Sequence, residues 1–254
     1  SHDIDCSMTV VYRLLFTLAV AVPCCVAQAC SPEPLPVEVA QAKQDLIEIC
    51  SNNLDKWGDD AFQQENIDGL VEILKEWFND NRPANEVELT KGSWLGLWYE
   101  DDSIIFSLPG FSLDRKNTYQ VVFDDFYYNV GKLDVGFSFL TKSFSTFLKG
   151  EFTIKDPPVN CGEERRNVID LEFSDYRLRL KWIDNDEPLT EITQAVDSRD
   201  VKSVGIPGPR GVAGDLWNLY IDDELRVAFG GNDDPEAEQS GLFVLIRQEF
   251  VSDD

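Results

Sequence analysis

Residues 216–227 read LWNLYIDDELRV, and residues 242–247, beyond an acidic loop, read LFVLIR. Far upstream, residues 91–99 read KGSWLGLWY. Each segment is short, rich in aliphatic and aromatic residues, and bounded by charged or turn-forming residues, which is typical of β-strands. We therefore expect these segments to be the opening and closing strands of one antiparallel barrel.

Between these segments the apolar residues recur with a period of two, which indicates further strands. The ranges with this pattern are 119–126, 132–139, 146–154, 168–173, 176–182, 215–221, 225–229 and 242–248. Together with residues 94–99 they predict eight or nine consecutive strands without an intervening helix. Such a series favours a closed up-and-down barrel, because closure leaves no unpaired edge. A β-sandwich is the alternative fold.

Two shorter segments within this region carry their own expectations. A tight turn at Ser174-Asp175 is expected to pair residues 168–173 with residues 176–182 as a hairpin. Residues 183–214 are polar and rich in Gly and Pro, and we expect a flexible flap at the mouth of the barrel.

The chain before residue 89 has helical rather than strand periodicity. One helix is expected from about Val37 to Cys50. A second is marked by an apolar stripe with helical spacing, formed by Ile67, Leu70, Val71, Leu74, Trp77 and Phe78. The predicted organisation is therefore a leader over residues 1–29, a helical segment over residues 30–88 and a barrel domain over residues 89–254.

The leader resembles a targeting signal. Arg13 precedes an apolar stretch over residues 14–26, and Ala27-Gln28-Ala29 has the small-residue pattern of a cleavage site. We expect a secretory or lumen-targeting signal, with an uncleaved anchor as the alternative. Cleavage would leave Cys30, Cys50 and Cys161, which allows either one disulfide with a free thiol or a simple buried Cys50.

Composition excludes several classes of function. The 22 Lys and Arg residues against 47 Asp and Glu give a net charge of −25, which disfavours nucleic-acid binding. The only histidine is His2, so histidine-based catalytic triads and zinc sites are excluded from the folded part. No metal site is predicted, and the acidic loop 230–241 lacks the spacing of a calcium-binding EF-hand. With so many acidic residues, a close carboxylate pair is no evidence for an enzyme, and we expect none.

The chain resembles the plastid lipid-associated proteins, also called the fibrillin family. The matching segments are AKQDLI at 42–47, the stripe over Ile67–Phe78, NRPA at 81–84, residues 92–99, YIDDELR at 220–226 and residues 242–247. The residues that carry this signature are Gly92, Trp94, Tyr220, Asp222, Asp223, Arg226 and Arg247. The resemblance implies a mainly β fold, a lipocalin-like antiparallel up-and-down barrel of about eight strands preceded by two N-terminal α-helices. It also implies that Trp94 closes one end of the barrel against Arg226 or Arg247.

A barrel of about eight strands can hold one small ligand in its interior. The candidate cavity residues are the aromatics Trp98, Phe123, Phe137, Phe152, Tyr176, Trp182 and Trp217. We expect a non-enzymatic protein that needs no cofactor and holds or organises a hydrophobic small molecule such as a lipid, carotenoid or quinone. The resemblance places it in plastids, in stroma or lumen, at the thylakoid or plastoglobule membrane or at a membrane-protein complex. The alternatives are a ligand-free subunit that docks on a photosynthetic membrane complex and a secreted lipocalin-like binder.

Overall fold

The computed structural model describes residues 34–100, 112–137, 140–155, 159–161, 164–166, 168–208, 211, 213–231 and 241–251. The predicted leader, Cys30 and most of the acidic loop 230–241 lie outside these residues. The chain divides into two units, Ser1–Pro34 and Leu35–Asp254, and all described helices and strands belong to the second. None of the described helices is long and apolar enough to cross a bilayer.

Both predicted N-terminal helices are present, as α1 (Val37–Asn52) and α3 (Asp68–Asp80). Three short elements accompany them: the 3-10 turn η1 (Leu54–Lys56), α2 (Asp60–Asn66) and α4 (Glu86–Thr90). The apolar stripe of α3 is its buried face, as its spacing predicted.

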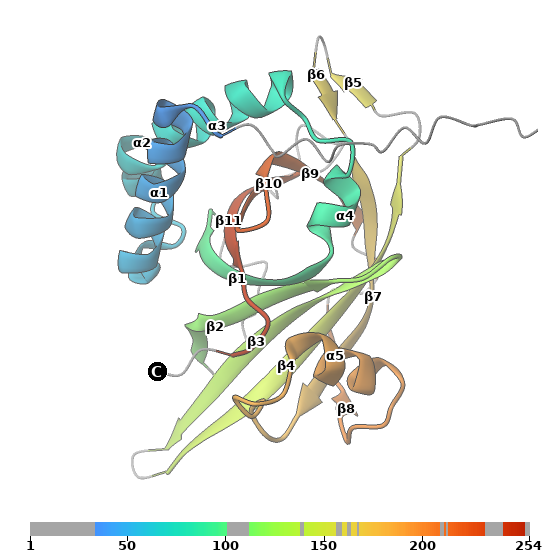
Figure 1. The fold of residues 1–254 in the computed structure, drawn as a ribbon. Coiled ribbons are helices and arrows are strands. Elements are labelled where there is room, and N and C mark those ends of the chain that lie inside the picture. Colours follow the sequence, from blue (N-terminus) through green and yellow to red (C-terminus); the bar gives the residue numbers. More distant parts are fainter. Residues whose placement is uncertain are drawn as a thin grey trace, which may run out of the picture. The chain divides into compact units, whose positions relative to one another are not determined.

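The strands form a closed antiparallel barrel, which confirms the predicted fold class (Figure 1). Eight strands pair in the ring order β1-β2-β3-β4-β7-β9-β10-β11, and β11 pairs again with β1. They are β1 (Gly92–Tyr99), β2 (Ser112–Val122), β3 (Phe126–Phe137), β4 (Leu140–Ile154), β7 (Ile169–Arg179), β9 (Ala213–Ile221), β10 (Leu225–Gly231) and β11 (Gly241–Arg247). Outside the ring, β5 (Val159–Cys161) pairs with β6 (Glu164–Arg166), and β8 (Val204–Gly205) pairs with β7.

The two faces of the barrel wall follow from the strand register. Gln120 on β2 hydrogen-bonds Arg226 on β10, and these strands are separated by β1 and β11, so the bond crosses the interior. Residues directly opposite each other share a face of a sheet. Trp94, which pairs with both Gln120 and Arg247, therefore lies inside, and its neighbour Leu95 lies outside.

Helices cover much of the outer face. The first helices lie beside β1, β10 and β11 in Figure 1, and Phe62 of α2 stacks on Trp98 at 5.5 Å between ring centroids. Trp77 and Phe78 of α3 pack against Tyr220 of β9. The helices bury the outward side chains of these strands, and the barrel interior buries the inward ones. For this reason side chains on both faces of these strands are apolar.

The predicted hairpin at Ser174-Asp175 is wrong, because β7 runs through both residues as one strand. Along β4, Lys149 pairs with Asp175 and Gly150 pairs with Phe173, so Ser174 is an extra residue in a β-bulge. A bulge adds one residue to a strand, so the alternation of apolar and polar residues is out of step by one position beyond it. A tight turn produces the same change in the sequence pattern. The predicted strand over 119–126 is correct in its first half and wrong at its end, because β2 ends at Val122 and β3 begins at Phe126.

The expected flexible flap over residues 183–214 is wrong for its central part. Helix α5 (Leu189–Asp197) forms there, and Leu189, Ile192 and Val196 are buried at helical spacing. The helix packs on the outer face of the barrel, where the hydroxyl of Tyr128 donates to Asp197 at 2.9 Å. The short apolar stripe between Pro188 and Arg199 therefore orders the segment by packing on the barrel.

Cys50 is a fully buried free thiol on α1, in agreement with its interpretation as a small core residue. Burial raises the pKa of this thiol to about 12. Cys161 lies in β5, but its side chain is outside the described part of the structure. The alternative of one disulfide with one free thiol thus stays a prediction.

Candidate functional site

One end of the barrel is closed around Trp94. The indole Nε1 donates to the carbonyl of Thr90 at 2.8 Å, and the guanidinium carbon of Arg247 lies 4.1 Å from the ring centroid. Arg247, rather than Arg226, is therefore the cation–π partner. Gly92 permits this contact, because its φ is +109° and a Cβ there would lie 2.6 Å from the Arg247 Nη1.

Arg247 also fixes α4 across this end of the barrel. Its Nη1 and Nη2 donate to the carbonyls of Lys91 and Leu89 at 2.9 and 2.6 Å, at the C-terminus of the helix. Helix C-termini carry free carbonyls and a partial negative charge, so a guanidinium is a favourable partner there. Arg247 thus connects β11 both to the C-terminus of α4 and to the ring of Trp94.

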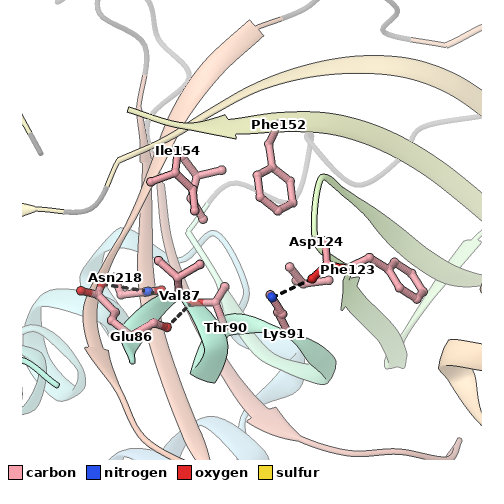
Figure 2. Close-up of a pocket in the computed structure, with 11 residues that line it drawn as sticks. Glu86, Val87, Thr90, Lys91, Phe123, Asp124, Phe152, Ile154 and Asn218 are labelled. Carbon is pink, nitrogen blue, oxygen red and sulfur yellow. Dashed lines mark hydrogen bonds and ion pairs between the residues drawn. The ribbon is translucent and has the colours of Figure 1, made fainter. Parts of the chain in front are cut away.

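Helix α4 presents polar side chains to the interior. Glu86 is 1 % exposed and accepts from the Arg82 Nη1 at 3.0 and 2.9 Å and from the Asn218 Nδ2 at 3.1 Å. Asn218 also donates to the Thr90 hydroxyl at 3.1 Å. Figure 2 shows Glu86, Thr90 and Asn218 on one side of a hollow, with Phe152 and Ile154 on the other. The hollow has a volume of about 20 Å³, which is room for about one water molecule and not for a lipid.

Arg226 on β10 is a charged side chain in the interior of the barrel. It is fully buried, its Nε donates to the Asn218 Oδ1 at 2.9 Å and its Nη1 donates to the Gln120 Oε1. Its Nη2 has no hydrogen-bond partner, and among the described residues it forms no ion pair. Burial lowers the pKa of Arg226 to about 10, against the opposing fields of Tyr99 and Glu86.

Tyr99 and Tyr127 lie near Arg226 in the interior, where each acts electrostatically on its guanidinium. A Cβ on Gly96 would lie 2.2 Å from the ring of Tyr99, and a Cβ on Gly150 would lie 2.3 Å from the ring of Tyr127. Each ring therefore lies flat against the barrel wall over a glycine. Neither hydroxyl hydrogen-bonds a described residue. We call Arg226, Tyr99 and Tyr127 the interior polar cluster.

Burial raises the pKa of both tyrosines in this cluster, and the charge of Arg226 only partly opposes the shift. Burial likewise raises the pKa of Tyr128, Tyr176 and Tyr220. In the unfolded chain these phenols ionise near pH 10. The folded protein therefore holds protons that the unfolded chain releases above that pH.

We accordingly expect the free energy of unfolding to fall steeply above about pH 10, by roughly 1.4 kcal/mol per pH unit for each protected tyrosine. Below pH 9 these tyrosines should contribute no pH dependence. Urea unfolding between pH 7 and 11, read by tryptophan fluorescence, measures the slope. Tyrosinate absorbance at 295 nm should appear together with unfolding; its appearance near pH 10 in the folded protein would contradict the burial.

The seven candidate cavity aromatics are not brought together. Phe152 and Tyr176 lie on the inner face, whereas Trp98 lies on the outer face against α2. Trp217 is also on the outer face, 5.1 Å from Phe229 between ring centroids. The expectation that all seven point inward does not hold for these two tryptophans.

The other three candidates lie at strand ends. Phe123 stacks on Phe126 in the β2–β3 turn, with 4.6 Å between ring centroids. Trp182 follows β7, and the Lys132 Nζ is 5.9 Å from its ring centroid. Phe137 ends β3, and its side chain lies outside the described part of the structure.

The acidic part of the signature holds the β9–β10 turn on α1. Asp222 accepts from the Tyr220 hydroxyl and from the Lys43 Nζ, each at 2.7 Å, and from the amide of Leu225. Burial acts to raise the pKa of Asp222, but these hydrogen bonds outweigh it, and the pKa lies below its usual range. Asp223 contributes its carbonyl, which accepts from the Arg247 Nε at 2.9 Å. These residues are structural.

Sequence reasoning missed the interior polar cluster as a site. Arg226 was singled out only as a partner for Trp94, and Tyr99 and Tyr127 were not singled out at all. A signal was present: Gln120, Asn218 and Arg226 are polar residues at positions where the inward side of an amphipathic strand should be apolar. Buried polar residues at such positions are the ones that need an explanation.

No protein-family model, curated protein or solved structure matches this chain. The fold therefore stands on the strand order itself: eight antiparallel strands, each beside its neighbour in the chain, closed by β11 on β1. That arrangement is lipocalin-like, and a barrel of this strand number is either filled by side chains or holds one small ligand.

Proposed function

We propose that this protein is a non-enzymatic binder that holds one small, mostly apolar molecule inside its barrel. The observation that carries the proposal is the interior polar cluster. Buried polar groups are nearly always hydrogen-bonded, yet the buried Nη2 of Arg226 has no partner among the described residues. The hydroxyls of Tyr99 and Tyr127 beside it also form no hydrogen bond with a described residue. Groups left in this state are suited to a molecule that is not part of the chain.

The surrounding wall is suited to an apolar ligand. Phe152, Phe173, Phe243 and Leu245 share the inner face by their register. Burying ~400 Å² of a lipid or isoprenoid against such a wall offers about 10 kcal/mol before the entropic cost of binding. A lipid, a carotenoid or a quinone is the class of ligand that fits this description.

Extraction of the natively purified protein with organic solvent, followed by mass spectrometry, tests the proposal. We expect about one lipid or pigment molecule per chain, and apoprotein that rebinds it with quenching of tryptophan fluorescence. A protein that is extracted empty and binds no member of these ligand classes would contradict the proposal. Co-migration of such an empty protein with a membrane complex would instead support a docking subunit.

The same proposal places the protein at thylakoid or plastoglobule membranes, in stroma or lumen. Its support is the resemblance of residues 81–84, 92–99 and 220–226 to the plastid fibrillins. Imaging the full chain with a C-terminal fluorescent tag in a plastid-bearing cell provides the measurement. Plastid fluorescence supports this location, and recovery of the protein from the medium would make it a secreted binder.

A further inference from the structure

We infer that the molecule held in the barrel is an amphipathic acid, whose carboxylate is bound by Arg226 together with the hydroxyls of Tyr99 and Tyr127. This inference rests on the proposed function and names the class of ligand. A long-chain fatty acid is the simplest molecule of this class.

The first step of the argument is the orientation of Arg226. Asn218 on β9 and Gln120 on β2 hold the Nε and Nη1 from two sides of the barrel. The guanidinium is planar and rigid, so these two bonds also fix the direction of the third nitrogen. The Nη2 is thus a positioned, fully buried donor without a partner.

The second step is the charge. A buried cation without a partner of opposite charge is strongly unfavourable. Glu86 contributes a favourable field at Arg226, but its oxygens accept from Arg82 and Asn218 instead. Arg247 adds a second positive charge that acts on Arg226. The field at the free nitrogen is therefore complementary to an anion.

The third step is the set of additional donors. Gly96 and Arg226 both pair with Leu245, so Tyr99, whose ring lies over Gly96, is on the wall next to Arg226. Tyr127 approaches from β3, and the charge of Arg226 acts on both phenols. One Nη2 and two hydroxyls supply three donors, and an ionised carboxylate has acceptor sites for about four.

The last step excludes neutral ligands as the best fit. A carotenoid hydrocarbon would leave all three donors unmet inside the barrel. A quinone carbonyl would accept a hydrogen bond but would bring no charge to Arg226. An acid meets both needs, while its chain lies against apolar residues of the inner face such as Phe152 and Leu245.

The experiment compares cis-parinaric acid, a fluorescent fatty acid, with its methyl ester on the full chain. Wild type should bind the acid at least 10-fold more tightly than the ester. The double variant Tyr99→Phe/Tyr127→Phe removes two hydroxyls that have no described partner and should fold normally. We expect it to bind the acid on the order of 10- to 100-fold more weakly, with little change for the ester.

Arg226→Met should abolish the preference for the acid altogether. If this variant does not fold, the tyrosine variant decides alone. Tyr128→Phe is the matched control, because its hydroxyl bonds Asp197 on the outer face, and it should bind the acid like wild type. Dodecyl phosphate provides a second arm, since binding tighter than that of lauric acid would make the head group a phosphate and overturn the carboxylate assignment.

Failure of the inference is distinguishable from failure of the proposed function. Equal binding of acid and ester by wild type, or an unchanged affinity of the double tyrosine variant, overturns the anionic head group but leaves a binder of apolar molecules. The same results are expected if the Nη2 of Arg226 hydrogen-bonds only a buried water molecule, and they would overturn the inference in that case too. Binding of neither compound would overturn the proposed function itself.

Discussion

Replacing Trp94 with Ala should lower the free energy of unfolding by about 3–5 kcal/mol, as large aromatic truncations in cores do. The indole is fully buried, so its removal leaves a cavity at the closed end. It also deprives the Thr90 carbonyl of its donor and Arg247 of the ring on which it stacks. Urea unfolding followed by circular dichroism measures the change.

Two further variants separate the role of Trp94 in closing the barrel from the general effect of removing an indole ring. Trp182→Ala, at a half-buried position after β7, should cost only about 1 kcal/mol. Arg247→Met keeps the bulk of the side chain but loses both the cation–π contact and the hydrogen bonds to three backbone carbonyls, and it should cost about 2–4 kcal/mol. A loss below about 1 kcal/mol in Trp94→Ala would show that Trp94 does not close the barrel.

The exchange of Glu86 for Gln should lower the free energy of unfolding by about 3 kcal/mol, although the two side chains have nearly the same shape. Removing one partner of a buried ion pair typically costs about 3–5 kcal/mol, because the other charge stays buried. The lower figure applies because the Arg82 side chain is 15 % exposed and keeps contact with solvent. Denaturant unfolding at neutral pH measures the loss.

The control for this exchange lies on the same helix. The Glu88 side chain is 65 % exposed and pairs with Lys91, so Glu88→Gln should change stability by less than about 1 kcal/mol. Combining Glu86→Gln with Arg226→Met should recover part of the loss, since the buried cation that the field of Glu86 also stabilises is then gone. Strict additivity of the two changes would contradict electrostatic coupling between Glu86 and Arg226.

Strand periodicity predicted the barrel but not the direction of every side chain. Trp94 and Trp98 are four residues apart, so an unbroken strand would point both inward. Leu97 is an extra residue between Gly96 and Trp98, and this bulge turns Trp98 outward onto α2. Ser174 has the same effect on β7. A bulge depends on what the neighbouring strand offers, and its own residues carry no distinct pattern.

Helix α5 illustrates a different limit. Its apolar residues Leu189, Ile192 and Val196 have helical spacing, but they stand within a segment dominated by Gly, Pro and charged residues. A helix of 9 residues is too short to be stable in water by itself. The outer face of the barrel supplies the burial that stabilises it, and that surface exists only after the strands have closed.

The candidate site also depends on tertiary contacts that the local sequence pattern does not contain. The sequence marked Arg226 and Arg247 as late arginines, and either was an acceptable partner for Trp94. Register decided between them: Arg247 pairs with Trp94, whereas Arg226 pairs with Leu245 and reaches Gln120 across the barrel. The distance between β2 and β10 around the ring cannot be read from the chain, which separates the two residues by 106 positions.

The sequence by itself determined that this chain is mainly β, that consecutive strands pair and that helices precede them, because those features depend on the local alternation of apolar and polar residues. It also predicted that no histidine takes part in the chemistry of the folded part, because its only histidine is residue 2. The tertiary structure alone decided which residues share the interior, because bulges and closure set each side chain's face through contacts between distant strands. For that reason the buried arginine and the two tyrosines became a candidate binding site only in the folded barrel.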